Sequence, residues 1–279
     1  MLKRHRPSTT ATRGRISVRR RGTSKNNPQK SLTSHLKRQF GRGRGKVSTR
    51  HKGGGHKRLF REIDFKQLRM DEPAKIIKIE YDPNRTAFIA LIEYPGGRRS
   101  YIIAYKGAKE GHEVIAGEKV PRRLGNRTRL KNLPLGTEIY NIELKPGRGG
   151  ILCRSAGSRA TVLSKEGKLV TLRMPSKERR LVLAECFASI GQVSNLDHAA
   201  IRFSKAGNKR HLGIRPTVRG VAMSPKSHPH GGGEGRSGIG MSTPKTVYGK
   251  PARGVKTRYG HKYSNKFILK RRSKGKKRK

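Results

Sequence analysis

The chain has 279 residues, of which 68 are Lys or Arg and 17 are Asp or Glu, giving a formal net charge of +51. Self-repulsion opposes folding of so basic a chain, so we expect a polyanionic partner, and nucleic acid is the first candidate. An anionic membrane surface is the rival partner. No apolar run approaches the ~18 residues of a spanning helix, and no amphipathic helix with a bulky apolar face is present, so no membrane partner is expected.

The charge is distributed unevenly along the chain. Residues 1–61 carry +20 and contain no acid, residues 62–197 carry +9, and residues 198–279 carry +22 with Glu234 as the only acid. This pattern predicts a moderately basic folded centre between two strongly basic extensions. The final charge block, within residues 265–279, is expected to lack fixed structure without a partner.

The N-terminus is rich in Arg, Ser and Thr, as organellar transit peptides are. Prolines and glycines interrupt any amphipathic helix in it, and the same bias continues to residue 61, which is longer than targeting requires. The two cysteines, Cys153 and Cys186, have no CxxC partner, so neither a zinc ribbon nor a disulfide framework is expected. They are predicted to be small core residues in a reducing compartment.

The centre begins with a predicted meander of strands. Apolar runs at 75–81, 86–94 and 98–105 are separated by the turn residues DPNR and PGG, and a fourth strand is expected at 112–120. Aromatic side chains in these strands are expected in the core rather than as exposed stacking platforms. They include Phe88, Tyr94, Tyr101 and Tyr105.

A second group of strands follows a charged loop at 122–136. A strand is expected at 137–144, a β-hairpin at 159–174 that turns near Glu166-Gly167, and a strand at 179–193 that ends in a short helical turn. The strands fall into two groups, each spanning ~60–70 residues. This arrangement predicts two small barrels in a mainly β chain. The side chains expected in the second core are Ile139, Ile142 and Leu144.

The first glycine-rich motif, STRHKGGGHKRLFREIDF, lies at 48–65. Three glycines permit positive φ and bring backbone N–H groups close to phosphates, although the motif is not a P-loop, because GxxxxGK[ST] is absent. A linker between extension and domain is the alternative. The charge density favours RNA contacts by Arg50, His51, Lys52, Gly53, Gly54, Gly55, His56, Lys57 and Arg58.

The second motif spans residues 209–240. Prolines forbid a continuous helix, and an extended chain with Arg at intervals is suited to the irregular backbone of a folded RNA. Arg210, Arg215 and Arg219 are the predicted contacts here. In the loop HPHGGGEGR the predicted contacts are His228, His230, Gly231, Gly232, Gly233, Glu234 and Arg236.

The two histidines and the glutamate of this loop could also form a catalytic or metal site. His228 and His230 lie two residues apart in a proline-containing loop without a third protein ligand, and no GxSxG elbow is present. We therefore expect no enzyme, no metal site and no cofactor, with magnesium ions bound only through RNA. Glu234 is expected to hold a neighbouring Arg or His side chain in position.

These motifs closely resemble the universal large-subunit ribosomal protein two family, in its bacterial or organellar form. The resemblance runs from about residue 28 to 272. It is carried by TRHKGGGHKRLFREIDF (49–65), EYDPNRTAFIALIEY (80–94), KPGRGGILCRSAG (145–157), RPTVRGVAM (215–223), HPHGGGEGR (228–236) and KFILKRR (266–272).

The resemblance implies an oligonucleotide-binding (OB-fold) barrel followed by an SH3-like barrel. The expected domains are a basic N-terminal arm at 1–60, the OB-fold barrel at 61–121, the SH3-like barrel at 122–197 and a basic C-terminal extension at 198–279. A basic N-terminal arm is usual in this family, which weakens the transit-peptide interpretation.

The implied function is that of a structural constituent of the large ribosomal subunit. It would bind large-subunit rRNA near the subunit interface and the peptidyl-transferase region, and support subunit association, tRNA binding and peptide-bond formation while RNA performs the chemistry. The implied partners are rRNA, neighbouring ribosomal proteins, the small subunit across the interface and nearby tRNA, with no homo-oligomer. The implied location is a bacterial cytoplasmic ribosome or, alternatively, a mitochondrial or plastid one.

The chain departs from the family pattern at a few positions. His211 stands where a Trp is usual, and SPKSHPH replaces NPVDHPH, with Ser224, Lys226 and Ser227 at the changed positions. Loss of the acid before His228 puts in doubt any role in which a carboxylate orients that imidazole. Two other functions remain as alternatives, an architectural DNA-binding protein and a metal-dependent hydrolase built on His228, His230 and Glu234.

Overall fold

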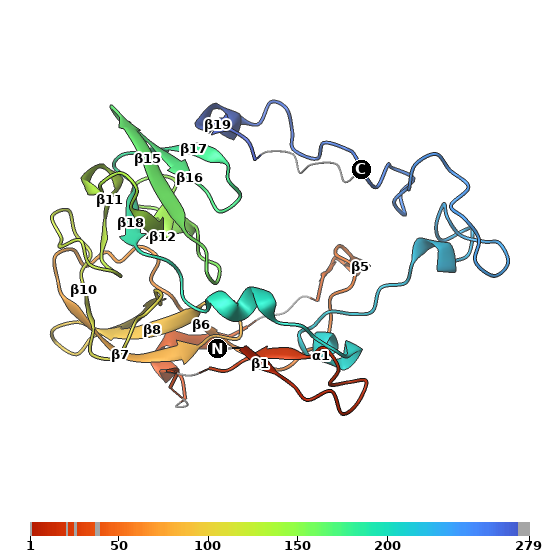
Figure 1. Cartoon of the computed structure of the whole chain (residues 1–279), viewed down its shortest axis with the longest axis horizontal. Helices are drawn as coiled ribbons and strands as arrows, with labels where there is room; N and C mark the ends of the chain where they lie inside the picture. Colours follow the sequence, from red (N-terminus) through yellow and green to blue (C-terminus); the bar gives the residue numbers. More distant parts are fainter. Residues whose placement is uncertain (1, 21, 25–26, 37–39, 273–279) are drawn as a thin grey trace. The chain divides into compact units, whose positions relative to one another are not determined.

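The structure is a computed structural model that describes residues 2–20, 22–24, 27–36 and 40–272 (Figure 1). The chain forms two compact units. The first contains residues 1–37, 57–204 and 266–279, and the second contains residues 38–56 and 205–265. Within the described ranges, no helix is both long and apolar enough to cross a lipid bilayer.

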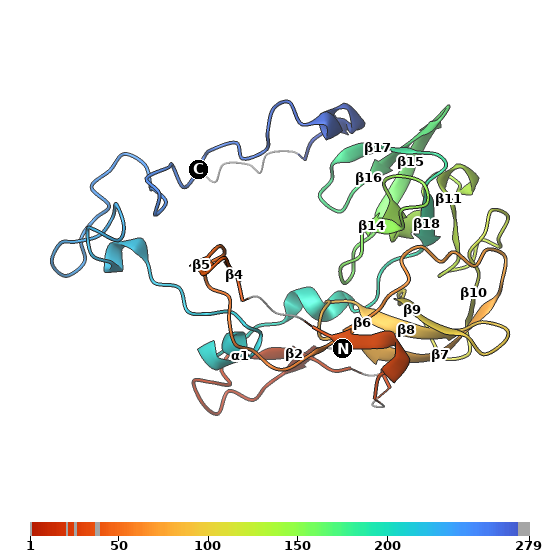
Figure 2. The ribbon, with the colours of Figure 1, turned by 180° about the vertical axis from the view of Figure 1, so that it is seen from behind.

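The first sheet of the first unit is an antiparallel meander. Its strand order is β10-β7-β8-β9, so that β7, β8 and β9 lie side by side in sequence order, as Figure 2 shows, and β10 pairs with the other edge of β7. The expected strands at 75–81, 86–94 and 98–105 are confirmed, while the one expected at 112–120 shrinks to two residues. The strands are β7 (Ala74–Tyr81), β8 (Phe88–Glu93), β9 (Arg99–Ile103) and β10 (Glu113–Val114).

The core of this sheet is aliphatic and aromatic. Tyr94, Tyr101 and Tyr105 are buried, which confirms their expected core position. The buried Tyr101 hydroxyl donates to Glu80 Oε2 at 2.9 Å and accepts from the Gln29 backbone N–H at 2.9 Å. Because each of these buried polar groups has a partner, the tyrosine ties the N-terminal segment to the sheet without a desolvation penalty.

The second sheet has seven strands in the order β11-β18-β12-β15-β16-β17-β19. Its apolar cluster is separate from that of the first sheet and includes Cys186, which is buried as predicted, while Cys153 is only half-buried and packs against both clusters. The strands are β11 (Arg127–Arg129), β12 (Glu138–Tyr140), β15 (Ala160–Glu166), β16 (Leu169–Arg173), β17 (Arg179–Leu183), β18 (Phe187–Ile190) and β19 (Ile268–Lys270).

Two predictions for the second sheet are wrong in part. The helical turn expected before residue 193 is the strand β18, which pairs with β11 and β12. The strand expected at 137–144 is interrupted at Asn141, whose φ is 49°, and continues as β13 (Ile142–Glu143), paired with β14 (Gly150–Leu152). The left-handed residue breaks the alternation of faces, so that Glu143 is buried and Leu144 only half-buried.

The buried Glu143 is paired with an equally buried arginine. Arg127 donates to Glu143 Oε1 at 3.0 Å and to the Asn141 carbonyl at 2.8 Å. The carboxylate also accepts from the backbone N–H groups of Gly147, Gly149 and Phe187. Burial lowers the pKa of Arg127 and the Glu143 carboxylate opposes that shift, so this carboxylate and the hydrogen bonds of the guanidinium offset the cost of burying it.

The basic N-terminal segment is held on the first unit by short strand pairs. β1 (Leu2–Arg4) pairs with β2 (Ile16–Val18), and β3 (Thr33–His35) pairs with β6 (Leu59–Arg61). A bridge between Ile16 and Arg202 connects it to the residues that follow the second sheet. Short 3-10 helices complete this unit at Lys30–Leu32, Leu130–Asn132 and Leu196–Ala200.

The second unit contains little regular structure. It has the strand pair β4 (Arg42–Gly43) and β5 (Lys46–Val47), the helix α1 (Ala206–His211) and a 3-10 turn at Gly220–Ala222. Beyond it, a 3-10 helix at Tyr263–Phe267 leads into β19, which pairs with β17. The tail expected to lack structure is therefore ordered at 268–270, and its last residues, 273–279, lie outside the described residues.

The chain is mainly β, and both large sheets curl. A parallel bridge from Ile63 to Tyr101 extends the first sheet beyond β9, and another joins Ala116, which follows β10, to Arg127 of β11 in the second sheet. Register shifts in β7, β15 and β17 bend the strands, as β-bulges do. These features fit the predicted fold class, an OB-fold barrel followed by an SH3-like barrel.

Candidate nucleic-acid interface

The two glycine-rich motifs come together in the second unit. The backbone N–H of Gly53 donates to Gly213 O at 3.0 Å, and that of His56 donates to His211 O at 3.0 Å. In the other direction, the N–H of Arg215 donates to His51 O at 3.0 Å. Residues 51–56 and 211–215 therefore form one paired element, although about 160 residues separate them in the sequence.

Of the three glycines at 53–55, Gly55 is the one that this pairing requires. A β-carbon on Gly55 would lie 2.9 Å from the Gly213 nitrogen, and one on Gly53 would lie 3.2 Å from Arg215 Cδ. For Gly54 no described atom lies within 4 Å of the corresponding position, and its φ is +60°. The close approach of two backbones thus explains Gly55 within the chain itself, whereas Gly53 meets only the Arg215 side chain, and RNA contact at these positions stays a prediction.

The paired element carries its cations on the outside. Arg50, Lys52, Arg210 and Arg215 are exposed, while the His51 side chain is half-buried. In the first unit, Lys57 is exposed, but the half-buried Arg58 donates to the Pro83 carbonyl at 3.0 Å and so supports the turn between β7 and β8. The predicted contacts of the first motif therefore divide into exposed cations and residues that hold the backbone.

The HPHGGGEGR loop is a compact turn. The N–H groups of Ser227 and His228 donate to Ser224 O at 2.9 and 3.2 Å, and that of Gly231 donates to His228 O at 2.9 Å. A further bond joins Gly232 N–H to the Met223 carbonyl at 3.0 Å. Ser224, a departure from the family pattern, contributes through its backbone, so that its side chain is not needed for this turn.

Both histidines of the loop are engaged by backbone donors. His228 is buried, and its Nδ1 accepts from the His230 N–H at 3.0 Å. His230 Nε2 accepts from the Lys245 N–H at 2.9 Å, and the two ring centroids are 4.8 Å apart. One nitrogen of each neutral ring is therefore occupied, and only the other remains as a donor to a ligand.

No metal centre forms among the described residues, where no three His, Cys, Asp or Glu side chains come together. Glu234 and Arg236 are exposed at the far end of the loop. Across the described ranges Glu234 makes no ion pair, and its backbone carbonyl accepts from Ser237 Oγ at 3.2 Å. The expectation that Glu234 holds a neighbouring Arg or His is wrong, because the turn directs its side chain to solvent.

One cluster of cations around an aromatic ring was not predicted from the sequence. The guanidinium groups of Arg85 and Arg154 lie 5.7 and 4.4 Å from the centroid of the Phe65 ring. Asp82 holds Arg85 at 2.5 Å, and burial, with Arg85 beside it, lowers the pKa of Arg154. Arg85 lies in the DPNR turn that the sequence identified, but the three segments approach one another only in the folded chain.

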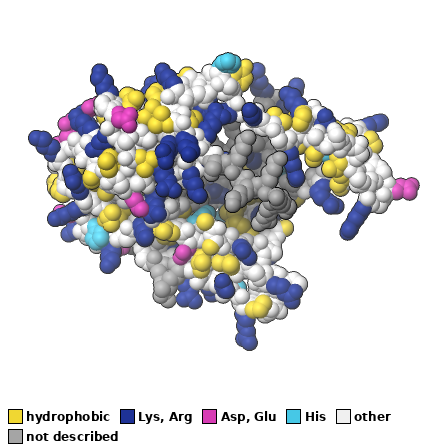
Figure 3. Space-filling model, turned by 45° about the horizontal axis from the view of Figure 1, so that its top comes forward, with side chains coloured by type: hydrophobic (Ala, Val, Ile, Leu, Met, Phe, Trp, Pro, Cys, Tyr) yellow, Lys and Arg dark blue, Asp and Glu magenta, His cyan; other side chains and the backbone are white. Residues whose placement is uncertain are grey.

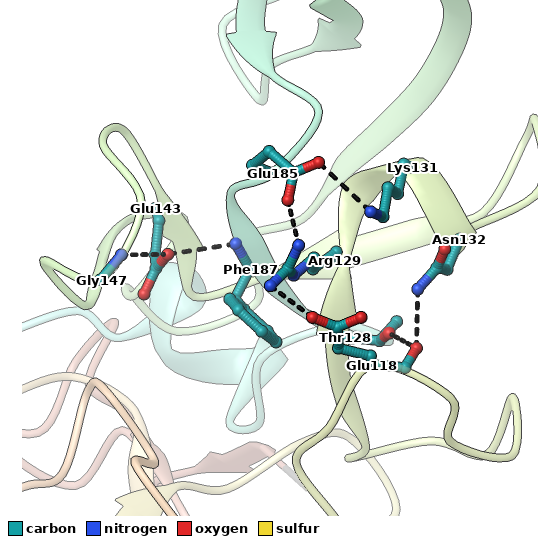
Figure 4. Close-up of polar contacts among 9 residues, drawn as sticks. All are labelled: Glu118, Thr128, Arg129, Lys131, Asn132, Glu143, Gly147, Glu185 and Phe187. Atoms are coloured by element: carbon teal, nitrogen blue, oxygen red, sulfur yellow. Dashed lines mark hydrogen bonds and ion pairs between the residues drawn. The ribbon is translucent and has the colours of Figure 1, made fainter. Parts of the chain in front are cut away.

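Glu118 and Glu185, at the edge of the second barrel, are paired with the chain's own cations. In Figure 4, Arg129 lies between Glu118 and Glu185 and pairs with both, and Lys131 Nζ lies 3.2 Å from Glu185. On the face drawn in Figure 3, blue Lys and Arg side chains are spread over the surface and magenta acids are few. The surface is therefore strongly electropositive, as binding to a polyanion requires.

Comparison with known families gives two matches in sequence order. Residues 29–116 match the RNA-binding N-terminal domain of ribosomal proteins L2, and residues 123–249 match the C-terminal domain of ribosomal proteins L2. The first match covers β3, β6 and the first sheet, and the second covers most of the second sheet and continues through the HPHGGGEGR loop. RNA binding and a place in the ribosome, as predicted, follow from these matches. The chain therefore belongs to the ribosomal protein L2 family, and its role is that of a structural protein of the large ribosomal subunit.

Proposed function

We propose that this protein binds large-subunit rRNA near the intersubunit face and the peptidyl-transferase region. There it supports subunit association, tRNA binding and peptide-bond formation, while the RNA performs the chemistry. The observation that carries the proposal is the pairing of residues 51–56 with 211–215, which gathers two basic, glycine-rich segments into one element with exposed arginines. Such an element offers charge-assisted donors to phosphates, and at Gly54, where the β-carbon position is open, an RNA backbone can come close.

The HPHGGGEGR loop is the second part of the proposed interface. Its backbone is fixed by its own hydrogen bonds and by the buried His228, so the exposed Arg236 and the remaining ring nitrogen of His230 are presented from a set position. Preorganised donors lose less conformational entropy on binding than those of an unstructured loop. We assign this loop to positioning RNA.

The proposed partners are large-subunit rRNA, neighbouring ribosomal proteins, the small subunit across the interface and nearby tRNA. We propose a monomeric protein without a cofactor of its own, whose magnesium ions are bound through rRNA, and no membrane partner. A bacterial cytoplasmic ribosome is the proposed location, with a mitochondrial or plastid ribosome as the alternative.

The test is competition and sedimentation. We expect the purified full-length chain to bind large-subunit rRNA in the presence of excess duplex DNA, with an affinity that falls steeply as salt rises, because bound phosphates release counterions. In a cell lysate, the protein should sediment with large ribosomal subunits. Preference for duplex DNA, or an affinity for rRNA that salt barely changes, would overturn the proposal.

A further inference from the structure

The outer face of the second barrel carries a row of directly opposed cations. Arg173 of β16 lies opposite Arg179 of β17, and Arg179 lies opposite Lys270 of β19. Residues directly opposite each other on antiparallel strands point to the same face, and neighbouring strands are about 4.8 Å apart. Three positive side chains therefore stand side by side over about 10 Å.

This row borders two adjoining hollows of about 320 and 430 Å³. The first is lined by Leu163, Arg173, Lys177, Arg179, Lys270 and Arg271, and contains no acid. The second shares Arg173 and Lys177 with it, and also contains no acid. The chain thus places five cations around the first hollow, two of them contributed by its C-terminal tail, and a sixth, Arg159, lines the second.

No described acid neutralises these five cations. Continuing the row in the other direction, Thr161 lies opposite Arg173, and Glu138 lies opposite Thr161. Glu138 is occupied by Arg159 at 2.7 Å. Glu178, in the turn between β16 and β17, makes no ion pair within the described part of the chain and lines neither hollow.

The contrast with the other cations of this barrel is informative. Arg129 and Lys131 pair with Glu185 (Figure 4), and the buried Arg127 pairs with Glu143, so other cations of this barrel do have carboxylate partners. Like charges directly opposite on adjacent strands destabilise a sheet, so the unpaired row costs stability in the free protein. A cost of this kind is offset when a polyanion binds.

We propose that the row Arg173–Arg179–Lys270, with Lys177 and Arg271, is an RNA-phosphate binding site on the second barrel. Arginine forks bind phosphate oxygens in pairs, and the absence of aromatic side chains from the lining of both hollows assigns the site to the RNA backbone rather than to bases. Because β19 supplies Lys270, the site is complete only when the tail is in place. The inference rests on the proposed rRNA binding and adds to it a surface remote in sequence from both glycine-rich motifs.

The test uses the full-length chain with Arg173, Arg179 and Lys270 all changed to Gln. Binding to large-subunit rRNA is measured over a range of salt, and thermal unfolding is measured without RNA. We expect the plot of log affinity against log salt to become less steep by about 2, since each lost phosphate contact removes 0.7–0.9 from the magnitude of the slope. The unfolding temperature of the free protein should stay the same or rise, because repulsion is relieved.

The matched control changes Arg98, Lys106 and Lys109, three exposed cations in turns of the first barrel, to Gln. Its net charge equals that of the variant of Arg173, Arg179 and Lys270 (the row variant). Its salt dependence should become less steep by less than half as much. Equal slopes for the row variant and the unchanged protein would overturn the inference, as would equal losses in the row and control variants. Loss of polyglutamate binding with rRNA binding intact would assign the row to an acidic protein and overturn it as well.

Failure of the underlying proposal is recognised separately. If the unchanged protein itself shows no preference for large-subunit rRNA over duplex DNA, the proposed function fails before any variant is compared. If the unchanged protein shows that preference and the row variant matches its slope, only the assignment of the row fails.

Discussion

The imidazole ring of His228 lies against the backbone of Gly220, so closely that a β-carbon at residue 220 would come within 2.5 Å of the ring. The sequence motif RPTVRGVAM and the HPHGGGEGR loop are therefore packed together, and the glycine exists to admit the ring.

From this contact we expect Gly220→Ala to displace His228 and open the loop. Overpacking of this kind costs about 1–3 kcal/mol, and the loss is local. Hydrogen exchange of the Gly231 and Gly232 amides, which are bonded to His228 O and Met223 O, should become faster.

Two comparisons make this expectation specific. Adding His228→Ala to Gly220→Ala should restore slower exchange, because the smaller side chain removes the overlap. Gly238→Ala, at a position with no described atom within 4 Å of the new β-carbon, should leave exchange unchanged. Unchanged protection in Gly220→Ala itself would contradict the assigned contact.

The paired glycine-rich segments give a second prediction. Gly55→Ala should weaken binding to large-subunit rRNA, because its β-carbon would lie 2.9 Å from the Gly213 nitrogen and its φ of +88° is strained for alanine. The free energy of unfolding of the barrels should change little, since the element belongs to the other unit. Gly207→Ala in α1, where no described atom lies within 4 Å, is the control and should bind rRNA normally. Normal binding by Gly55→Ala would count against the paired element as an RNA contact.

The third prediction concerns the buried ion pair of the second barrel, Arg127 and Glu143. Arg127→Met should lower the free energy of unfolding by about 3–5 kcal/mol, because it leaves the Glu143 carboxylate buried without its counter-charge. Adding Glu143→Gln should recover part of the loss, since a neutral amide still accepts from backbone donors. Urea unfolding followed by circular dichroism measures both.

The exposed pair in the same sheet is the reference for this experiment. Arg159→Met removes the partner of Glu138, whose side chain is 43% exposed, and should cost less than about 1 kcal/mol. If the Arg127 and Arg159 variants lost equal stability, burial would not be what makes the Arg127 pair important.

Alkaline pH provides a fourth prediction, from the thiols. Burial raises the pKa of Cys186 from its ordinary value of 9.0 to about 12, and Glu143 adds to the shift. Burial raises the pKa of Cys153 likewise to about 12. Above pH 9 the unfolded chain loses these protons while the folded chain keeps them. The stabilisation is therefore complete below pH 9 and is lost as the pH rises towards 12, at about 1.4 kcal/mol per pH unit and thiol.

Urea unfolding at pH 8, 9, 10 and 11 checks this slope. Cys186→Ala should be less stable than the unchanged protein at pH 8 but should lose stability more slowly above pH 9. Burial also raises the pKa values of the Tyr101 and Tyr140 hydroxyls, which act in the same direction above pH 10. The stability of Cys186→Ala therefore still falls with pH, but less steeply than that of the unchanged protein. Parallel pH profiles for the two proteins would contradict the assignment to the thiol.

Strand positions were readily predicted where local pattern decides them. The runs that became β7, β8 and β9 are short apolar segments between clear turn signals, and the hairpin of β15 and β16 turns at the expected Glu166-Gly167. The sequence failed where a single backbone conformation intervened. Asn141 is left-handed, a conformation that Asn tolerates better than most residues, but the apolar residues on both sides of it favoured an unbroken strand.

The candidate interface was predicted by residue type but not by arrangement. Composition and motif identified the cations and glycines of both segments, yet the bonds of Gly53 to Gly213 and of His51 to Arg215 are long-range and leave no periodic trace. The same holds for the row of Arg173, Arg179 and Lys270, because strand register decides which charges face each other. Glu234 was misjudged, since charge alone does not say which way a turn directs a side chain.

The tail strand β19 also dictates an order of events during synthesis. Between the end of β17 and the start of β19 lie 84 residues, so β17 is made long before the strand that covers it. At 5–20 residues per second, its edge stays open for roughly 4 to 17 seconds. Open strand edges pair readily with other chains. The positive charges of Arg173 and Arg179 next to the edge of β17 discourage such pairing until residues 268–270 emerge. The charge row then protects the nascent barrel before it meets any RNA.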